Sequence, residues 1–357
     1  MKRSNQHKMK KNIFLFPLLA LLMVACSKVR VAKDLPELTT PEYRDSVRSA
    51  IVWIEQVAKE KADSIRKVDS LRNATGGGPD PDDLRFKKDL LIGYVEVNNR
   101  AFKNVTCFLD EEGKPVIDLA LMFAPNININ PATGKAHITY NDQVKGTINN
   151  GYLRYVQSKG IKVGMTILGN HDNAGFRNFR NLAEATEFAQ HVAMEVRRLG
   201  LDAIDFDDEY SANPLWANNE SFTMVVSEIK RLLPDKFVMC YIFGGASASS
   251  WNGTRIGDYA DVGCSAFYPQ IPGAGSAGFP VNKLIASASY TYGGFGNPEQ
   301  DMKSLKTNGY RGVMIFDVRG LVGFTNFFAP YVKGMKDKTL TVVPGCLNAT
   351  ENDDVNK

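Results

Sequence analysis

The segment LDAIDFDDEY, residues 201–210, holds acidic residues at a spacing that could support chemistry. Asp205, Asp207 and Glu209 occupy every second position, with hydrophobic Ile204 and Phe206 among them. Side chains alternate between the two faces of a β-strand, so the three acids would share one face. Crowded carboxylates disfavour one another's charge, so at least one should keep its proton well above its ordinary pKa. General acid catalysis of glycosidic cleavage requires such a group.

Two simpler interpretations of this segment fit less well. A calcium loop needs a glycine at its sixth position and ligands spread over twelve residues, which DFDDEYSANPLW does not supply. A solvated run of charges would not alternate with hydrophobic residues directly after a helix that ends at Gly200. Beyond residue 25 the histidines are dispersed, so we predict no metal site and no cofactor. They are His137, His171 and His191.

The rest of the chain predicts elements that would hold these acids in a barrel. Eight short, hydrophobic, β-rich runs occur at residues 90–97, 116–123, 162–169, 201–207, 237–243, 261–267, 283–290 and 312–318. Helix-like segments such as 183–200 and 221–233 separate several of them. This alternation predicts a (β/α)8 TIM barrel with the acids pointing inward at the C-terminal end of its fourth strand. A doubly wound open sheet is the alternative, but no glycine-rich phosphate loop follows the first run.

The N-terminus has the composition of an export signal. Residues 1–25 join a basic start to IFLFPLLALLMVA, which is too short to span a bilayer comfortably. The sequence MVAC resembles a bacterial lipobox, whose cysteine becomes lipidated. We therefore predict a lipoprotein signal peptide over residues 1–25 and a membrane anchor on Cys26. An uncleaved anchor helix is the alternative. The predicted location is the cell envelope, as an outer-membrane lipoprotein in either leaflet.

Composition divides the remainder into segments. A long helix is predicted over residues 41–73, as a solvated spacer or a strut packed on the main domain rather than a dimeric coiled coil. With the linker ATGGGPDPDD it forms an N-terminal segment, residues 26–83. The barrel is expected over residues 84–343 and a C-terminal tail over 344–357. The 357 residues are 44% hydrophobic, enough for one large core.

Charge and cysteine content exclude some partners. Five of the 43 basic residues lie within residues 1–25, which hold no acidic residue, so the rest of the chain is nearly neutral and no nucleic-acid partner is expected. The cysteines beyond the predicted anchor show no framework of spacings, and their pairing stays open. They are Cys107, Cys240, Cys264 and Cys346.

The acidic segment carries a family resemblance. LDAIDFDDEY resembles the DxxDxDxE signature of glycoside hydrolase family 18, and FDDEYSA is most similar to the bacterial endo-β-N-acetylglucosaminidases of the Endo F1 and Endo H type. The segments KGIKVGMTILGNHDNAGFRNF and NGYRGVMIFDV resemble their third and eighth strands. The similarity covers roughly residues 90–335. The acidic positions of the signature are filled by Asp202, Asp205, Asp207 and Glu209.

The resemblance implies substrate-assisted, retaining hydrolysis. Glu209 would protonate the departing glycosidic oxygen and later deprotonate water, while the substrate's 2-acetamido oxygen acts as the nucleophile. Asp207 would orient the acetamido N–H, with Asp205 as its hydrogen-bond partner. In the family a tyrosine after strand six holds the acetamido group. Tyr268 fills that role here, unless a shift of one position places Phe267 there.

Other predicted contacts with sugar rest on position and residue type. Asn170 and His171 follow the third strand, and Tyr210 and Trp251 lie on loops after strands, where aromatic faces stack on sugar rings. Trp216 is a further candidate. Phe324, Phe327 and Phe328 in GFTNFFAP are predicted to form a platform after strand eight. Phe316 stands where chitinases of the family usually carry tryptophan, which favours the endoglycosidase branch.

Three functions compete at this point. The preferred one is a lipid-anchored endo-β-N-acetylglucosaminidase that cuts between the core GlcNAc residues of N-glycans, with a glycoprotein as substrate and neighbours in a glycan-uptake system as possible partners. The second is a glycan-binding lipoprotein of the same fold with weak or no turnover. The third is a chitinase. A long chitin groove needs several exposed tryptophans, and the chain has only three, so this function is less favoured. They are Trp53, Trp216 and Trp251.

Overall fold

The computed structural model covers most of the chain beyond the predicted signal peptide. The residues that it describes are 41–75, 80, 82–211 and 217–347. The chain divides into two compact units, Met1–Ala50 and Ile51–Lys357. The predicted signal peptide and Cys26 lie outside the described residues. Within the described ranges, no helix combines the length and the apolar character needed to cross a bilayer.

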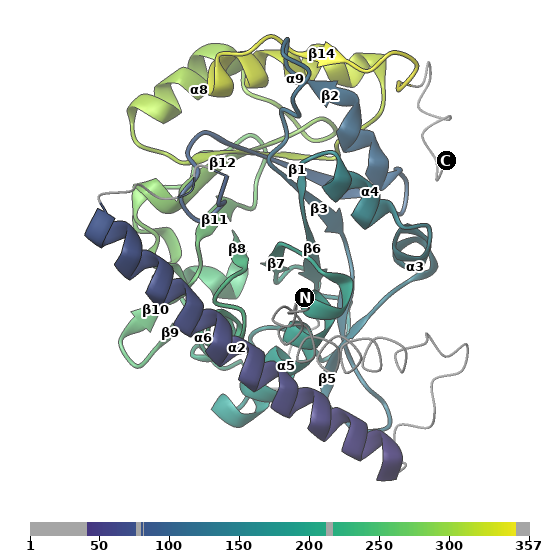
Figure 1. The fold of residues 1–357 in the computed structure, drawn as a ribbon, viewed down its shortest axis with the longest axis vertical. Helices are drawn as coiled ribbons and strands as arrows, with labels where there is room; N and C mark the ends of the chain where they lie inside the picture. Colours follow the sequence, from purple (N-terminus) through teal and green to yellow (C-terminus); the bar gives the residue numbers. More distant parts are fainter. Residues whose placement is uncertain (1–40, 76–79, 81, 212–216, 348–357) are drawn as a thin grey trace, which may run out of the picture. The chain divides into compact units, whose positions relative to one another are not determined.

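Eight parallel strands close into a barrel (Figure 1). They follow one another around the barrel in chain order. The first strand, β1, pairs with the last strand, β13, and with β3, and β3 pairs in turn with β6. The eight strands therefore form a closed ring without an open edge. The predicted barrel is confirmed, and the open doubly wound sheet is wrong. The barrel strands are β1 (Leu90–Glu96), β3 (Leu119–Phe123), β6 (Lys162–Leu168), β7 (Ala203–Asp207), β8 (Phe237–Ile242), β11 (Val262–Ser265), β12 (Leu284–Ser289) and β13 (Gly312–Phe316).

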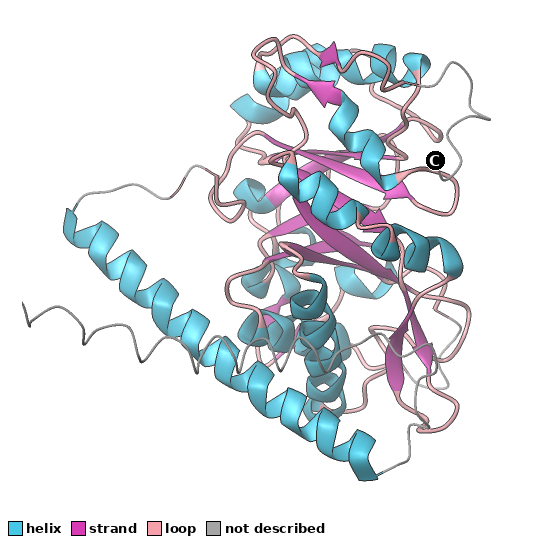
Figure 2. Cartoon of the chain, turned by 45° about the vertical axis from the view of Figure 1, so that its right-hand side comes forward, coloured by secondary structure: helices cyan, strands magenta, loops and turns pink. Residues whose placement is uncertain are grey.

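Helices surround the strands (Figure 2). Asparagine side chains cap the starts of α3 and α5 by accepting hydrogen bonds from backbone amides, and α5 ends at Gly200 in the left-handed conformation that glycine favours. The predicted helices are therefore present close to their expected bounds. The helices are α2 (Pro41–Thr75), α3 (Asp142–Asn149), α4 (Tyr152–Ser158), α5 (Leu182–Leu199), α6 (Ser221–Leu232), α7 (Ile256–Tyr259), α8 (Pro298–Thr307) and α9 (Val322–Lys336).

Short strands and 3-10 helices lie in the loops outside the barrel. The hairpin of β4 and β5 continues the sheet beyond β6, where Asn126 pairs with Leu168. The strands outside the barrel are β2 (Phe108–Leu109), β4 (Asn126–Ile129), β5 (Ala136–Thr139), β9 (Ser250–Trp251), β10 (Thr254–Arg255) and β14 (Thr341–Val342). The 3-10 helices are η1 (Phe102–Cys107), η2 (Gly244–Ser247), η3 (Ser276–Gly278) and η4 (Val281–Lys283).

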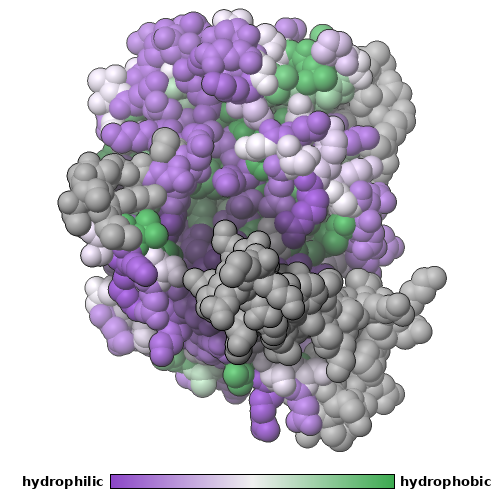
Figure 3. Space-filling view, in the orientation of Figure 1, coloured by the Kyte–Doolittle hydropathy of each residue, from purple (hydrophilic) through white to green (hydrophobic). Residues whose placement is uncertain are grey.

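The hydrophobic core has two parts, one on each face of the closed sheet. The outer part lies between the strands and the helices, where Ile204 and Phe206 of β7 are fully buried and Phe206 contacts Phe222 of α6. The inner part fills the barrel and includes Tyr94 and Met239. The hydrophobic residues on the face shown in Figure 3 are scattered. The same face has a hollow near its centre. Burial of one face of β7 forces its alternating acids to the other.

Three aspartates fix the register of neighbouring strands at the N-terminal end of the barrel. Each lies directly before a strand and exchanges two hydrogen bonds with the second residue of the preceding barrel strand. Its backbone N–H donates to that residue's carbonyl, and its Oδ2 accepts from that residue's N–H at 2.8 to 3.0 Å. The pairs are Asp118 with Leu91, Asp202 with Val163 and Asp261 with Val238. Asp202, the first acid of the family signature, is therefore a structural residue.

A disulfide joins distant parts of the chain. Cys107, after the first strand, is bonded to Cys346 in the C-terminal tail, across 239 residues of sequence. Closing such a long loop restricts the unfolded chain and thereby stabilises the fold. Cys240 and Cys264 are buried and free. The sequence did not resolve this pairing.

The part of helix α2 from Ile51 onward belongs to the same compact unit as the barrel. Ile54 and Ala58 are buried in the outer core. Glu55 forms an ion pair with Arg231 of α6 at 2.6 Å and accepts a hydrogen bond from Gln190 of α5 at 3.2 Å. These contacts are those of a strut on the main domain.

Candidate active site

Strand β7 brings the signature acids to the C-terminal end of the barrel. Asp205 is fully buried and Asp207 is 3% exposed, and both lie on the inward face because Ile204 and Phe206 occupy the outward one. Glu209 follows the strand and is half-buried. The structure therefore places the three acids together at the end of the barrel where barrel enzymes have their active sites.

Asp205 is held by hydroxyl groups from two other barrel strands, of which only β6 is adjacent to β7. Its Oδ2 accepts hydrogen bonds from the Tyr94 hydroxyl of β1 at 3.0 Å and from Thr166 Oγ1 of β6 at 2.9 Å. Its Oδ1 is buried and has no hydrogen-bond partner among the described residues. Burial raises the pKa of Asp205 to about 6, although both hydroxyl hydrogen bonds oppose that rise.

Asp207 lies between the other two acids. Its Oδ1 accepts a hydrogen bond from the Glu209 backbone N–H at 3.2 Å. Burial raises the pKa of Asp207 well above its ordinary value, and the charges of Glu209 and Asp205 raise it further. The direction agrees with the effect expected of crowded carboxylates, but burial contributes more than the neighbouring charges.

Glu209 combines partial exposure with a perturbed carboxyl group. Burial raises its pKa. Such a group can both hold a proton and reach a substrate oxygen, which general acid catalysis needs. The third-strand loop packs directly against it, since a Cβ added at Gly169 would lie 2.0 Å from the Glu209 carbonyl oxygen. Only glycine fits there, which explains the glycine of the LGNH turn.

Asp208 has no role in the predicted site, but its side chain holds the loops around the acids together. Its Oδ1 accepts hydrogen bonds from the Phe176 backbone N–H at 3.1 Å and from Ser211 Oγ at 3.0 Å. Burial raises the pKa of Asp208 to about 6. It therefore joins the segment after β6 to the segment after β7.

The side chains of Tyr268 and Phe267 differ in burial, which distinguishes the two candidates for the acetamido-binding position. Phe267 is 62% exposed, whereas Tyr268 is partly buried and packs on the inner core. The Tyr268 hydroxyl lies 3.0 Å from the hydroxyl of Tyr241 on β8. Burial raises the pKa of Tyr268, and the charges of Asp207 and Glu209 raise it further. Tyr268 is thus the tyrosine of this loop that faces the site.

Aromatic rings form the floor beside the acids. Phe316 of β13 stacks on Tyr268 with 5.7 Å between ring centroids and on Tyr292 with 6.1 Å, and it meets Phe123 edge-on at 5.2 Å. Tyr292 is 69% exposed. Such stacked faces suit the apolar face of a sugar ring. Sequence reasoning singled out only Phe316 and Tyr268 among these residues.

Asn170, His171 and Tyr210 lie on the exposed rim. The His171 backbone N–H donates to the Tyr210 carbonyl at 2.6 Å, and the two rings lie 5.2 Å apart. Asn170 Nδ2 donates to Asn128 Oδ1 of β4 at 3.2 Å. These residues therefore join the loops after β6 and β7 to the β4–β5 hairpin while their side chains remain accessible.

The other aromatic residues predicted to contact sugar lie in different parts of the structure. Trp251 is partly buried against the outer core, and Trp216 lies outside the described residues. The predicted phenylalanine platform is wrong, because its residues belong to helix α9 rather than to a loop. Phe324 and Phe328 are buried in the outer core against Phe108, and Phe327 packs at its edge.

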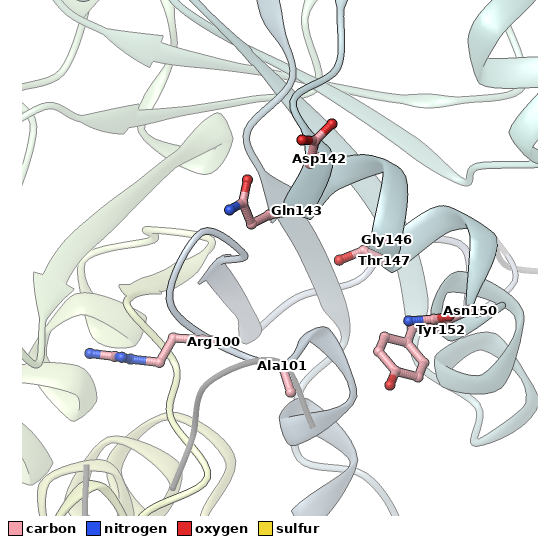
Figure 4. Close-up of a pocket in the computed structure, with 8 residues that line it drawn as sticks. All are labelled: Arg100, Ala101, Asp142, Gln143, Gly146, Thr147, Asn150 and Tyr152. Atoms are coloured by element: carbon pink, nitrogen blue, oxygen red, sulfur yellow. The ribbon is translucent and has the colours of Figure 1, made fainter. Parts of the chain in front are cut away.

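A separate pocket of about 210 Å³ lies between the segment after β1 and the helices α3 and α4 (Figure 4). None of its lining residues belongs to the acidic group of β7, so we do not identify it with the site. Its lining residues are Arg100, Ala101, Asp142, Gln143, Gly146, Thr147, Asn150 and Tyr152. Within the described ranges no group of three or more histidine, cysteine or acidic side chains could hold a metal ion.

A closed (β/α)8 barrel with alternating acids at the end of its fourth strand, a tyrosine facing them and an aromatic floor defines a family 18-type glycosidase site. Comparison of the sequence with known proteins gives a more specific result. The chain is 36% identical over 205 residues to an endo-β-N-acetylglucosaminidase of Flavobacterium sp., covering 55% of this chain and 64% of that protein. It is 31% identical over 244 residues to endo-β-N-acetylglucosaminidase F1 of Elizabethkingia meningoseptica, covering 63% and 70%. No family model matches the sequence.

This chain belongs to the endo-β-N-acetylglucosaminidase F1 family, the branch of glycoside hydrolase family 18 that the motifs predict. The fold agrees with two structures of EndoBT-3987 from Bacteroides thetaiotaomicron. One, with Man5GlcNAc product, superposes with a TM-score of 0.65 and 22% identity over 73% of this chain and 64% of that one. The other, with Man9GlcNAc2Asn substrate, gives 0.64 and 21% over 73% and 69%.

Proposed function

We propose that this chain is an endo-β-N-acetylglucosaminidase that cleaves the GlcNAc-β1,4-GlcNAc core of N-glycans. The observation that carries the proposal is the group of Asp205, Asp207 and Glu209 at the C-terminal end of β7, with the first two buried on its inward face and Tyr268 packed on the inner core of the same barrel. Membership of the F1 family and the N-glycan ligands of EndoBT-3987 support the substrate class.

The reaction would use the substrate's own amide as nucleophile. Glu209 donates its proton to the glycosidic oxygen as the C1–O bond breaks, and the 2-acetamido carbonyl oxygen bonds to C1 to give an oxazolinium ion. Asp207 accepts the acetamido N–H and stabilises its positive charge. The expected hydrogen bond from Asp205 to Asp207 is not formed among the described residues, where Asp205 accepts from Tyr94 and Thr166 instead. Glu209 then takes a proton from the water that attacks C1, so the configuration at C1 is retained.

A glycoprotein with a high-mannose N-glycan tests the proposal. Incubation with the protein should leave one GlcNAc on each glycosylated asparagine, which intact-mass measurement detects. Glu209→Gln should abolish the change. Glu187→Gln, which alters an exposed glutamate on α5, should not affect it. Binding of the glycan without cleavage would instead favour a non-catalytic glycan-binding protein, and cleavage of chitin oligomers alone would favour a chitinase.

We also propose that the protein is a lipoprotein of the outer membrane, anchored through Cys26. The lipobox-like MVAC after a short hydrophobic run supports this location. Metabolic labelling with a radioactive fatty acid should mark the protein and should fail with Cys26→Ala. If the variant is still labelled, this anchor is wrong. A glycan released at the cell envelope would be passed to an uptake system there.

A further inference from the structure

Tyr241 is a buried tyrosine beside the site that the reaction scheme above does not use. It lies on β8, faces the inside of the barrel and is 4% exposed. In the parallel pairing of β8 with β11 it stands opposite Cys264. The chain continues from there to Tyr268, so both hydroxyls come to the same end of the barrel.

The Tyr241 hydroxyl has more acceptors than hydrogens. It lies 2.7 Å from the Ala266 carbonyl oxygen and 3.0 Å from the Tyr268 hydroxyl. A phenol carries one hydrogen, so it can donate fully to only one of these oxygens at a time. Two arrangements of the hydrogens therefore satisfy the pair.

The two arrangements have different consequences for a ligand. If Tyr241 donates to Ala266 and Tyr268 donates to Tyr241, the Tyr268 hydrogen is used in the bond between the two hydroxyls and is not available to a ligand. If Tyr241 donates to Tyr268, the Tyr268 hydrogen is directed elsewhere and can reach a ligand oxygen. Of the two arrangements that keep the hydrogen bond between the hydroxyls, only the second lets Tyr268 donate to an acetamido carbonyl.

Both hydroxyls stay protonated at any working pH. Burial raises the pKa of Tyr241 and of Tyr268 far above the ordinary value for tyrosine, and the negative charge of Asp207 raises both further. The pair therefore always holds two hydrogens close to Asp207. Deprotonation of either tyrosine cannot resolve the competition between the acceptors.

We infer that Tyr241 is a positioning residue, which donates to Tyr268 and thereby directs the Tyr268 hydrogen toward the acetamido carbonyl of the bound sugar. Tyr241 does not touch the reacting atoms and acts only through Tyr268. This inference rests on the proposed function, because it concerns the group that the proposed substrate presents.

A double-mutant cycle on the full chain tests the inference with a high-mannose glycopeptide as substrate. Tyr268→Phe should lower kcat/KM on the order of 10²-fold, as the loss of a donor in an active site does. Tyr241→Phe should lower kcat roughly fivefold to tenfold with KM changed less than about twofold, since one neutral hydrogen bond is lost and the ring remains. In the Tyr268→Phe background, Tyr241→Phe should cause no further loss.

Tyr331→Phe is the matched control. Tyr331 is a buried tyrosine of α9 whose hydroxyl accepts the Phe295 N–H at 2.9 Å, away from the acids of β7. It should keep wild-type kcat and KM. Equal, multiplicative losses in both backgrounds, or a loss in KM with kcat unchanged, would overturn the role of Tyr241 while leaving the proposed function intact. If the wild-type protein does not cleave the glycopeptide, the proposed function is wrong and this inference falls with it.

Discussion

Acidic residues at the two ends of the barrel have opposite surroundings. At the N-terminal end, Asp118 pairs with Lys336 at 2.6 Å and Lys87 at 3.0 Å, and Asp261 pairs with Lys230 at 2.6 Å. At the C-terminal end, no lysine or arginine in the described part of the chain pairs with the acids of β7. Hydroxyl groups surround Asp205 instead.

This difference belongs to β7 rather than to the whole C-terminal end. Asp317, which follows β13, is paired with Arg319 and lies 3.3 Å from Arg100. The fold can therefore supply cations at that end, yet no lysine or arginine of residues 41–75, 80, 82–211 and 217–347 is paired with Asp205, Asp207 or Glu209. Asp118 and Asp261 fix strand register while paired with lysines, and Asp202 does so with a hydrogen bond from Gln157, whereas burial raises the pKa values of the acids of β7.

The largest expected effect concerns Glu209. Glu209→Gln removes the proton donor and should lower kcat/KM by roughly 10³-fold or more. The free energy of unfolding should change by less than about 0.5 kcal/mol, because the side chain is only half-buried and pairs with no cation in the part of the chain that the structure describes. Glycopeptide hydrolysis and urea unfolding measure the two effects. A variant that loses stability along with activity would contradict the division between the two ends.

The next effect concerns the N-terminal end. Asp118→Asn removes a buried charge that faces Lys87 and Lys336, and the free energy of unfolding should fall by about 3 kcal/mol. The kcat of the folded protein should stay unchanged. Asp142→Asn, on an exposed aspartate of α3, is the control and should be neutral within about 0.5 kcal/mol. An unchanged urea midpoint for Asp118→Asn would show that the cations at this end do not stabilise the fold.

The smallest of the three effects concerns Asp205, whose substitution should increase the free energy of unfolding rather than decrease it. The pKa of Asp205 is raised to about 6 in the folded protein, so its contribution to stability is present below its ordinary pKa and is lost as the pH rises through about 6. Asp205→Asn should therefore raise the free energy of unfolding by about 2 kcal/mol at pH 7 and by much less at pH 4. Activity should fall. Destabilisation at pH 7 would mean that a charged Asp205 stabilises the fold.

The sequence predicted the barrel and the acidic face because both follow from local patterns. Period-two alternation in residues 201–207 requires one face of β7 to be buried, and eight hydrophobic runs separated by helices leave few other folds. The family resemblance added Tyr268 to the site. It left open whether Tyr268 or Phe267 faces the acids, which depends on how the chain turns after β11.

Other site residues could not be found because they depend on the register between strands. Thr166 reaches Asp205 because the two residues stand opposite each other in the pairing of β6 with β7. Tyr94 reaches the same oxygen from β1, on another part of the barrel wall. Alternation along each strand indicates that such residues face inward. It does not indicate which residues of different strands lie at the same level along the barrel axis.

The phenylalanine platform failed for a different reason. Phe324, Phe327 and Phe328 follow strand eight in a segment that reads as a loop, but helix α9 begins at Val322 and includes Pro330. Spacings of three and four place Phe324, Phe327 and Phe328 toward the same side of the helix, which packs into the core. Tertiary packing therefore decided what the local composition left ambiguous.

Direct titration of the acids tests the central claim that β7 carries proton-holding carboxyl groups without cations. Carboxyl-¹³C NMR of the protein, with resonances identified from the Asp207→Asn and Glu209→Gln variants, would follow each group with pH. We expect the pKa values of Asp207 and Glu209 to lie above those of ordinary carboxyl groups, with Asp207 raised more. Titration of both groups at or below ordinary values would contradict the account.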